Sequence, residues 1–288
     1  MEKYRGLVTQ GGGILGIAHL GVATILKEYG IYQQIKYFAG SSVGAIMSGL
    51  FACRIDPQRI EKLLFKTKIG FFDLSPLISI LSNITKPFTS FEKNFGYANS
   101  IELKLFYQIL LKIFIGDPHI TFAQVYERYD SFLIVTATDI GQQSTVYYSP
   151  DTSPEMSIAE AVRRSAAAPP VFSPISENGH LYADGGLTDN YPIEKLYEYL
   201  RPEEVFGVRL IPNKYPSIPN TVPSNFHQYM NTISEMMVRN LMNLGCYENS
   251  ILVNTGDISP MNFKISREEK LFLFRQGQSA AIEFFENS

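Results

Sequence analysis

Two glycine-rich turns, each between an apolar strand and an apolar helix, constrain the fold of this chain more than any other feature. The first turn is QGGGILG, which follows a strand predicted over residues 4–9 and precedes a helix predicted over about 17–29. The second is GSSVG at 40–44, between a short strand predicted over 35–39 and the apolar segment AIMSGLFAC. Strands that alternate with helices in this way build a mainly parallel sheet flanked by helices. The sequence therefore predicts an α/β protein.

Later segments continue the alternation. Further strands are predicted over residues 132–138, 144–149, 180–184, 205–210 and 251–255, the second of them pairing with the first as a hairpin. Further helices are predicted to begin at Asp56-Pro57, Thr121, Ser153-Pro154, Pro192 and Ser266. Thr121 with Gln124, and Ser266 with Glu269, have the spacing of a capping box. The helix that begins at Ser153-Pro154 must end before Pro169-Pro170, since proline cannot continue a helix.

The chain shows no repeat, low-complexity segment or linker, so we expect one domain over residues 4–288. Its core is predicted over 4–210, and a C-terminal strand and helices are predicted over 211–288. The apolar stretch at about 66–116 is predicted to be a helical insertion over the sheet. A flap that admits lipid is the alternative interpretation of this stretch.

Composition excludes several classes of function. The net charge of −3, without a long basic run, predicts no binding to nucleic acid. The two cysteines, Cys53 and Cys246, cannot form a disulfide framework and are expected to be reduced core residues. We see no charged-then-apolar leader and no apolar stretch long enough to span a bilayer. The expected location is the cytoplasm, with peripheral contact to membranes left open.

The first glycine turn has the spacing of a dinucleotide-binding fingerprint, with Gly11, Gly13 and Gly16 in the pattern G-x-G-x-x-G. That fold also needs an acidic residue at the end of the second strand to bind the ribose. Here the second strand ends in YFAGSSVG, which contains no acid, and no lysine of a P-loop follows the first turn. Nucleotide binding is therefore disfavoured, and only a dinucleotide that raised thermal stability would restore it.

The second turn matches G-x-S-x-G, the pattern of a nucleophile on a tight turn between a strand and a helix. The flanking glycines relieve crowding in the strained turn, and the serine oxygen becomes exposed. The N-terminus of the following helix favours negative charge nearby. The pattern assigns the central position to Ser42, with Ser41 as the competing serine.

A serine nucleophile needs a base, and the chain offers four histidines. His227 follows all the candidate acids, so a triad of Ser42, Asp184 and His227 remains an alternative. The other three are expected in structural roles: His19, His119 and His180. One observation weighs against the triad, because only one strand and one helix precede Ser42, whereas several strands precede the nucleophile in the usual α/β-hydrolase order.

Taken in order along the chain, several motifs together resemble the patatin-like phospholipases. QGGGILG resembles the glycine-rich oxyanion loop of that family, and GSSVG resembles its nucleophile turn. TFAQVYERYDSFLIVTATDI and AVRRSAAAPPVFSP resemble the central strand and the helix-then-proline block that follows it. ADGGLTDNYP resembles the D-G-G/A motif with its downstream Asn-Tyr/Phe-Pro. The similarity spans about residues 4–210 and implies a three-layer α/β/α fold.

The resemblance also implies a Ser-Asp dyad in place of a triad. Carried over by motif, Ser42 is the nucleophile and Asp184 is the general base. The resemblance places the oxyanion hole at the backbone N–H groups of Gly11, Gly12 and Gly13. The supporting glycines of the motifs are Gly16, Gly40, Gly44, Gly185 and Gly186. No metal or cofactor is implied, and the lone Asp139 is expected to form a turn.

The implied activity is that of a lipid acyl hydrolase, of the phospholipase A or lysophospholipase type, acting on lipid esters at a membrane or micelle surface. This chain departs from the family pattern at Leu15, where many relatives carry Arg or Lys, and at Gln10, where Asp or Ser is common. Hydrolysis of neutral lipids or short esters is therefore an alternative, and a non-catalytic lipid-binding module is a remote one. Arg163 and Arg164 could supply the missing charge, although a solvated helix face is the expected place for them.

Overall fold

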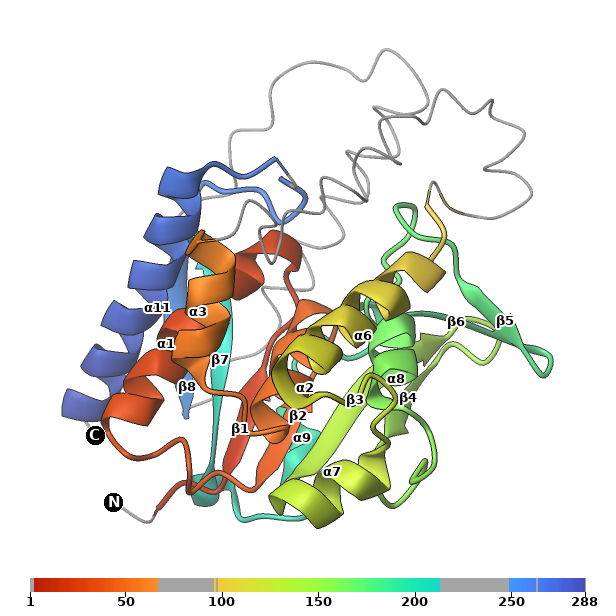
Figure 1. Cartoon of the computed structure of the whole chain (residues 1–288), viewed down its shortest axis with the longest axis horizontal. Coiled ribbons are helices and arrows are strands. Elements are labelled where there is room, and N and C mark those ends of the chain that lie inside the picture. The colour runs from red at the N-terminus through yellow and green to blue at the C-terminus, as the bar shows by residue number, and fades with distance from the viewer. Residues whose placement is uncertain (1–2, 67–95, 97, 213–248, 263, 288) are drawn as a thin grey trace.

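The computed structural model describes residues 3–66, 96, 98–212, 249–262 and 264–287 (Figure 1). Within these residues the chain is organised around an eight-stranded sheet. The strands are β1 (Gly6–Thr9), β2 (Tyr37–Gly40), β3 (Phe132–Asp139), β4 (Ser144–Tyr148), β5 (Ile175–Glu177), β6 (His180–Asp184), β7 (Val205–Pro212) and β8 (Ser250–Gly256).

The strand order is β5-β6-β3-β2-β1-β7-β8, with β4 paired to β3 outside this path. The pairs that join β3, β2, β1, β7 and β8 are parallel, whereas β4, β5 and β6 run antiparallel to their neighbours. All eight residues of β3 are buried, as expected for a strand covered on both faces. The prediction of a mainly parallel α/β sheet is confirmed.

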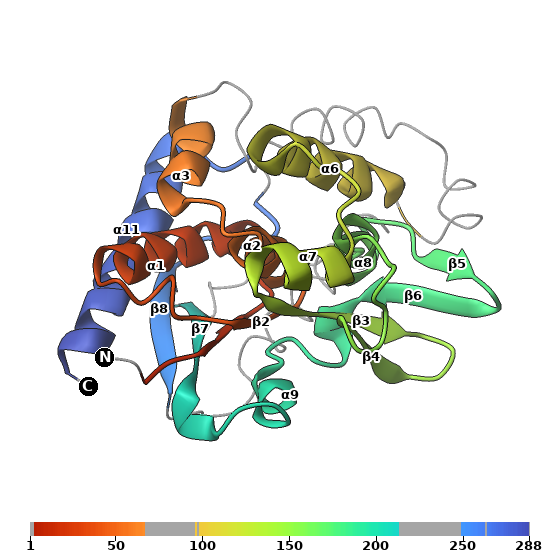
Figure 2. The same cartoon turned by 60° about the horizontal axis from the view of Figure 1, so that its bottom comes forward.

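Helices cover both faces of this sheet (Figure 2). They are α1 (Ile17–Glu28), α2 (Val43–Ala52), α3 (Pro57–Lys66), α6 (Ile101–Ile115), α7 (Phe122–Tyr129), α8 (Ile158–Ser165), α9 (Ile193–Tyr197) and α11 (Arg267–Glu286). One buried apolar cluster joins α1, α2, α8 and α11 to one face, and a second joins α9 to the other face. The described residues thus form three layers, with the sheet in the middle.

Most helix starts follow the predicted signals. Both capping boxes, Thr121 with Gln124 and Ser266 with Glu269, are present. The helix predicted from Ser153-Pro154 is wrong at its start, because Ser157 caps it and the helix begins at Ile158. The short strand β5 was not predicted either. Of the predicted insertion at about 66–116, the structure describes α6, while residues 67–95 and 97 lie outside the description.

The register of β3 brings the two motif residues together. Val135 pairs with Gly40 at the end of β2, and Ala137 pairs with Asp184 at the end of β6. β4 pairs with Val135 and Ala137 along the opposite side of β3. β2 and β6 therefore lie along the same side of β3, one after the other. Ser42 follows Gly40 by two residues, so the chain after β2 turns directly toward Asp184.

Candidate active site

Ser42 lies on the sharp turn between β2 and α2. Its φ of 54° and ψ of −124° fall in a region that residues with a Cβ rarely adopt. Its backbone N–H donates a hydrogen bond to Ser165 Oγ at 2.9 Å, and Ser165 is the last residue of α8. The strained backbone and this hydrogen bond hold the Ser42 side chain at the carboxyl end of β2, as a nucleophile turn requires.

The Ser42 hydroxyl points at Asp184. Its Oγ donates a hydrogen bond to Asp184 Oδ2 at 2.7 Å, although the two residues are 142 positions apart. The other carboxylate oxygen, Oδ1, accepts a hydrogen bond from the Gly186 N–H at 2.8 Å. Thr138 Oγ1 donates to the Asp184 carbonyl at 2.8 Å and fixes the end of β6. The carboxylate is therefore oriented at both of its oxygens.

Burial changes the basicity of Asp184. The side chain is only 6% exposed, and burial raises its pKa from the ordinary value to about 6. The hydrogen bonds from Ser42 and from the Gly186 N–H act in the opposite direction and keep the rise from being larger. At neutral pH the group is mainly ionised, yet it holds a proton more readily than an exposed aspartate does.

The glycine loop (residues 10–16) lies against the serine turn (residues 40–44), and two of its N–H groups are available as hydrogen-bond donors. A Cβ on Gly11 would lie 3.1 Å from the Ser42 Cβ, so only a residue without a side chain fits. The N–H groups of Gly12 and Gly13 have no hydrogen-bond partner among the residues that the structure describes. Gly11, in contrast, donates its N–H to the Asn190 carbonyl at 3.1 Å. Of the three predicted oxyanion donors, Gly11 is thus the one whose N–H already has a partner within the protein.

Asn190 connects the glycine loop to the loop of Asp184. Its side-chain Nδ2 donates to the Gly11 carbonyl at 3.2 Å, while its own carbonyl accepts the Gly11 N–H. A Cβ at Gly11 would lie 2.2 Å from Asn190 Oδ1, and one at Gly186 would lie 2.7 Å from the same oxygen. The amide thus fills the space between the two loops. Sequence reasoning noted the Asn-Tyr-Pro motif without assigning Asn190 a role, and it missed Ser165 altogether.

The histidines that the structure describes form hydrogen bonds with residues other than Ser42 and Asp184. His19 is buried in α1, where its Nε2 donates a hydrogen bond to the Gln10 carbonyl at 2.8 Å, and burial lowers its pKa to about 4. His119 Nδ1 lies 3.1 Å from Gln108 Nε2. The structural roles predicted for His19 and His119 agree with these contacts. His227, the histidine of the alternative triad, lies outside the described residues.

Asp139 forms a turn at the end of β3, as predicted. Its Oδ1 accepts the N–H groups of Gly141 at 2.9 Å and Gln142 at 3.2 Å. Its Oδ2 lies 2.6 Å from His180 Nδ1, which gives His180 a structural partner. Ser41, the competing serine, is fully buried, and its Oγ has no hydrogen-bond partner in the described part of the chain. The geometry favours Ser42 over Ser41.

The two positions that depart from the family pattern face the interior. The Leu15 side chain is 1% exposed and belongs to the main apolar cluster. Gln10 is equally buried, and its Oε1 accepts the Leu210 N–H at 2.8 Å. A lysine or arginine in place of Leu15 would have to enter this core. In this chain Leu15 instead packs within the apolar core.

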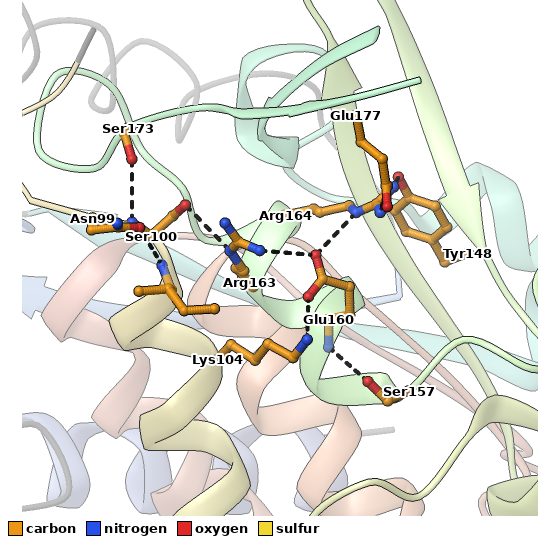
Figure 3. Close-up of polar contacts among 11 residues, drawn as sticks. Asn99, Ser100, Lys104, Tyr148, Ser157, Glu160, Arg163, Arg164, Ser173 and Glu177 are labelled. Atoms are coloured by element: carbon orange, nitrogen blue, oxygen red, sulfur yellow. Dashed lines mark hydrogen bonds and ion pairs between the residues drawn. The ribbon is translucent and has the colours of Figure 1, made fainter. Parts of the chain in front are cut away.

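Arg163 and Arg164 do not lie on a solvated helix face, so that expectation is wrong. Figure 3 shows both guanidinium groups directed at Glu160, with nitrogen-to-oxygen distances of 3.3 and 3.5 Å. Arg164 also pairs with Glu177 and donates to the Tyr148 hydroxyl at 3.1 Å. Both guanidinium groups are paired within a network around α8, and within the described structure neither forms a hydrogen bond or ion pair with Ser42 or Asp184.

A mainly parallel sheet with a serine on a strained strand-to-helix turn is typical of α/β proteins that present a nucleophile at the carboxyl end of a strand. A family model of patatin-like phospholipases matches residues 7–197 of this chain. The match covers more than half of the chain and includes both glycine turns and Asp184. The chain belongs to the patatin-like phospholipase family, a family of lipid hydrolases.

Relatives support this assignment, and two of them are of similar length. Uncharacterized protein R571 of Acanthamoeba polyphaga mimivirus is 29% identical, over 96% of this chain and 92% of that protein. A probable lipid hydrolase, 463L of Invertebrate iridescent virus 6, is 27% identical over 97% of this chain and 88% of its own length. Lysophospholipase NTE1 of Cryptococcus neoformans is 30% identical over 67% of this chain, which corresponds to 10% of that much longer protein.

Solved structures confirm the fold. VipD from Legionella pneumophila superposes with a TM-score of 0.62, at 20% identity, over 99% of this chain and 67% of that chain. ExoU of Pseudomonas aeruginosa, in its complex with SpcU, superposes with a TM-score of 0.52 at 18% identity, over 99% of this chain and 52% of that chain. At these identities the likeness concerns architecture alone.

Proposed function

We propose that this protein hydrolyses the fatty-acyl esters of lipids, as a phospholipase A or lysophospholipase, with Ser42 as nucleophile and Asp184 as general base. The observation that carries the proposal is the 2.7 Å hydrogen bond from Ser42 Oγ to a buried carboxylate whose pKa is raised to about 6. Relatives named as a probable lipid hydrolase and a lysophospholipase support the substrate class.

The reaction begins when Asp184 takes the proton of the Ser42 hydroxyl and Oγ attacks the ester carbonyl carbon. The tetrahedral oxyanion then accepts hydrogen bonds from the N–H groups of Gly12 and Gly13, and each such donor can contribute about 3 kcal/mol to transition-state stabilisation. Asp184 returns the proton to the departing alcohol or lysolipid oxygen. Water next attacks the acyl-enzyme with Asp184 again as base, and the fatty acid is released.

The backbone prepares this site before substrate binds. Gly13 has a φ of +55°, and a Cβ there would lie 2.2 Å from the Pro260 carbonyl oxygen. Only glycine is compatible with both the conformation and the space. Because the loop is already folded against the serine turn, little reorganisation is required when the oxyanion forms.

Replacement of the nucleophile tests the proposal. We expect Ser42→Ala to lower kcat for a lysophospholipid and for a monomeric nitrophenyl ester by about 10⁴-fold or more, since the covalent route is removed. His227→Ala is the matched test of mechanism, and the dyad predicts a rate within about threefold of the parent protein. Circular dichroism checks that both variants remain folded.

Two results would contradict the proposal. Full activity of Ser42→Ala would exclude Ser42 as the nucleophile. A large fall in the rate of hydrolysis by His227→Ala would favour the triad. A panel of phospholipids and neutral lipids, with analysis of the position cleaved, separates the proposed substrates from the neutral-lipid alternative. If a fluorophosphonate fails to label the folded parent protein, the non-catalytic lipid-binding alternative is correct.

A further inference from the structure

The outward face of α6 carries a row of exposed aliphatic side chains. Leu105, Ile109 and Ile113 are 52%, 58% and 52% exposed. Their spacing of four residues places them on one side of the helix. The opposite side is buried against the protein through Tyr107 and Leu111. A helix at the surface of a globular protein normally presents polar residues outward, so this face is exceptional.

Basic residues flank the row. Lys112 lies beside Ile113 on the exposed side and makes no ion pair with any residue that the structure describes. Arg59 of α3 lies over the Phe114 ring, with 5.4 Å between guanidinium carbon and ring centroid, at the last turn of α6. Lys62, also exposed, follows one turn later on α3, where Glu61 is half-buried. The acids beside the row are less accessible, because Glu102 of α6 is half-buried and Asp117, just after α6, pairs with Arg128 at 2.9 Å. The exposed charged side chains described on α3 and α6 are therefore positive.

The same helix is tied to the helix beside the nucleophile. Lys104 of α6 pairs with Glu160 of α8 at 2.8 Å, and Figure 3 shows this contact at the centre of the polar network. The last residue of α8, Ser165, accepts the hydrogen bond from the Ser42 N–H. In Figure 2, α3 and α6 lie on the same side of the sheet as α8. A surface bound at α6 would thus lie on the side of the molecule from which α8 supports the nucleophile turn.

We propose that the α6 face, defined as Leu105, Ile109, Ile113, Lys112 and Arg59, docks on the surface of a lipid bilayer that carries anionic headgroups. No helix in the described part of the chain is long and apolar enough to cross a membrane. An aliphatic row bordered by cations is the composition of a helix that lies in the interface, with its apolar side chains below the headgroups. The inference rests on the proposed function, which requires access to lipid esters.

Vesicle sedimentation tests this docking. Phosphatidylcholine vesicles with and without about 30% phosphatidylserine are the probes, because anionic lipid attracts the basic side chains of the α6 face. We expect Ile109→Glu with Ile113→Glu to lower the vesicle partition coefficient by about tenfold or more, since two carboxylates must then enter the interface. Lys112→Glu with Arg59→Glu should remove the preference for phosphatidylserine. Leu252→Glu is the control, because Leu252 of β8 is 57% exposed but lies outside this face.

Several outcomes would overturn the docking proposal. They are unchanged vesicle binding in the two double variants, an equal loss in Leu252→Glu, and a change of oligomeric state by light scattering, which would assign the face to a second copy. A large fall in Tm for Ile109→Glu with Ile113→Glu would show that the face is covered. Hydrolysis of a monomeric ester separates the proposals: hydrolysis without vesicle binding contradicts only the docking, and vesicle binding without hydrolysis contradicts only the proposed function.

Discussion

Two aspartates end neighbouring antiparallel strands, and their chemistry differs. Asp184 closes β6 and Asp139 closes β3, and both side chains are buried. Each accepts at least one backbone N–H in the turn that follows. The pKa of Asp184 is nevertheless raised to about 6, whereas that of Asp139 is lowered. The position of an aspartate at the end of a strand therefore does not by itself raise its pKa.

The difference lies in the hydrogen-bond donors around each carboxylate. His180 donates to Asp139, two backbone N–H groups do the same, and together they stabilise the charged form. Asp184 receives one hydroxyl and one N–H, and it has no cationic partner among the described residues. Desolvation therefore dominates at Asp184 and raises its pKa, which supports the proposed role of this carboxylate as the base.

The largest effect is expected when each aspartate is replaced by its amide. Asp184→Asn should lower kcat by about 10⁴-fold or more, because an amide cannot accept the Ser42 proton. Asp139→Asn should leave kcat within about threefold, since Asp139 holds a turn. Ester hydrolysis under saturating substrate, with Tm as the check on folding, measures both. Equal losses in the two variants would mean that the contrast between these aspartates has no catalytic meaning.

A smaller effect is expected at Asn190, whose side chain lies between the glycine loop and the loop of Asp184. Asn190→Ala removes the amide between Gly11 and Gly186, so the glycine loop loses its position relative to the dyad. We expect kcat to fall by about 10- to 100-fold, with KM for a monomeric ester changed less than threefold, as for loss of an interaction realised in the transition state. A rise in KM with unchanged kcat would indicate a role in binding instead.

Much of the site could be predicted because its signals are local. A serine between glycines after a short strand, and an aspartate before two glycines at the end of another, each define a turn within a few residues. The mainly parallel sheet follows from the alternation of strands and helices, and the capping boxes from pairs three residues apart. Their order along the chain, through the family resemblance, indicated that the two turns act together.

The rest depends on contacts between distant segments. Gly11 is separated from Asn190 by 179 positions, so nothing in QGGGILG reveals that the Gly11 N–H is already donated to the Asn190 carbonyl. Arg164 forms an ion pair with Glu177 of β5, a strand of three residues that is too short to show a pattern. The start of α8 was misplaced because Ser157 caps it, although Ser153-Pro154 offers a similar signal.

The central claim is that the hydroxyl of Ser42 is activated by a carboxylate with a raised pKa. The most direct measurement is the rate at which a fluorophosphonate labels Ser42, followed by mass spectrometry from about pH 4 to about pH 8. Asp184 accepts a proton only when it is ionised, so the rate should be half-maximal near pH 6, constant above it, and about tenfold lower for each pH unit below it. His227→Ala should show the same profile. A midpoint near pH 4, labelling of another residue, or loss of labelling in His227→Ala would contradict the account.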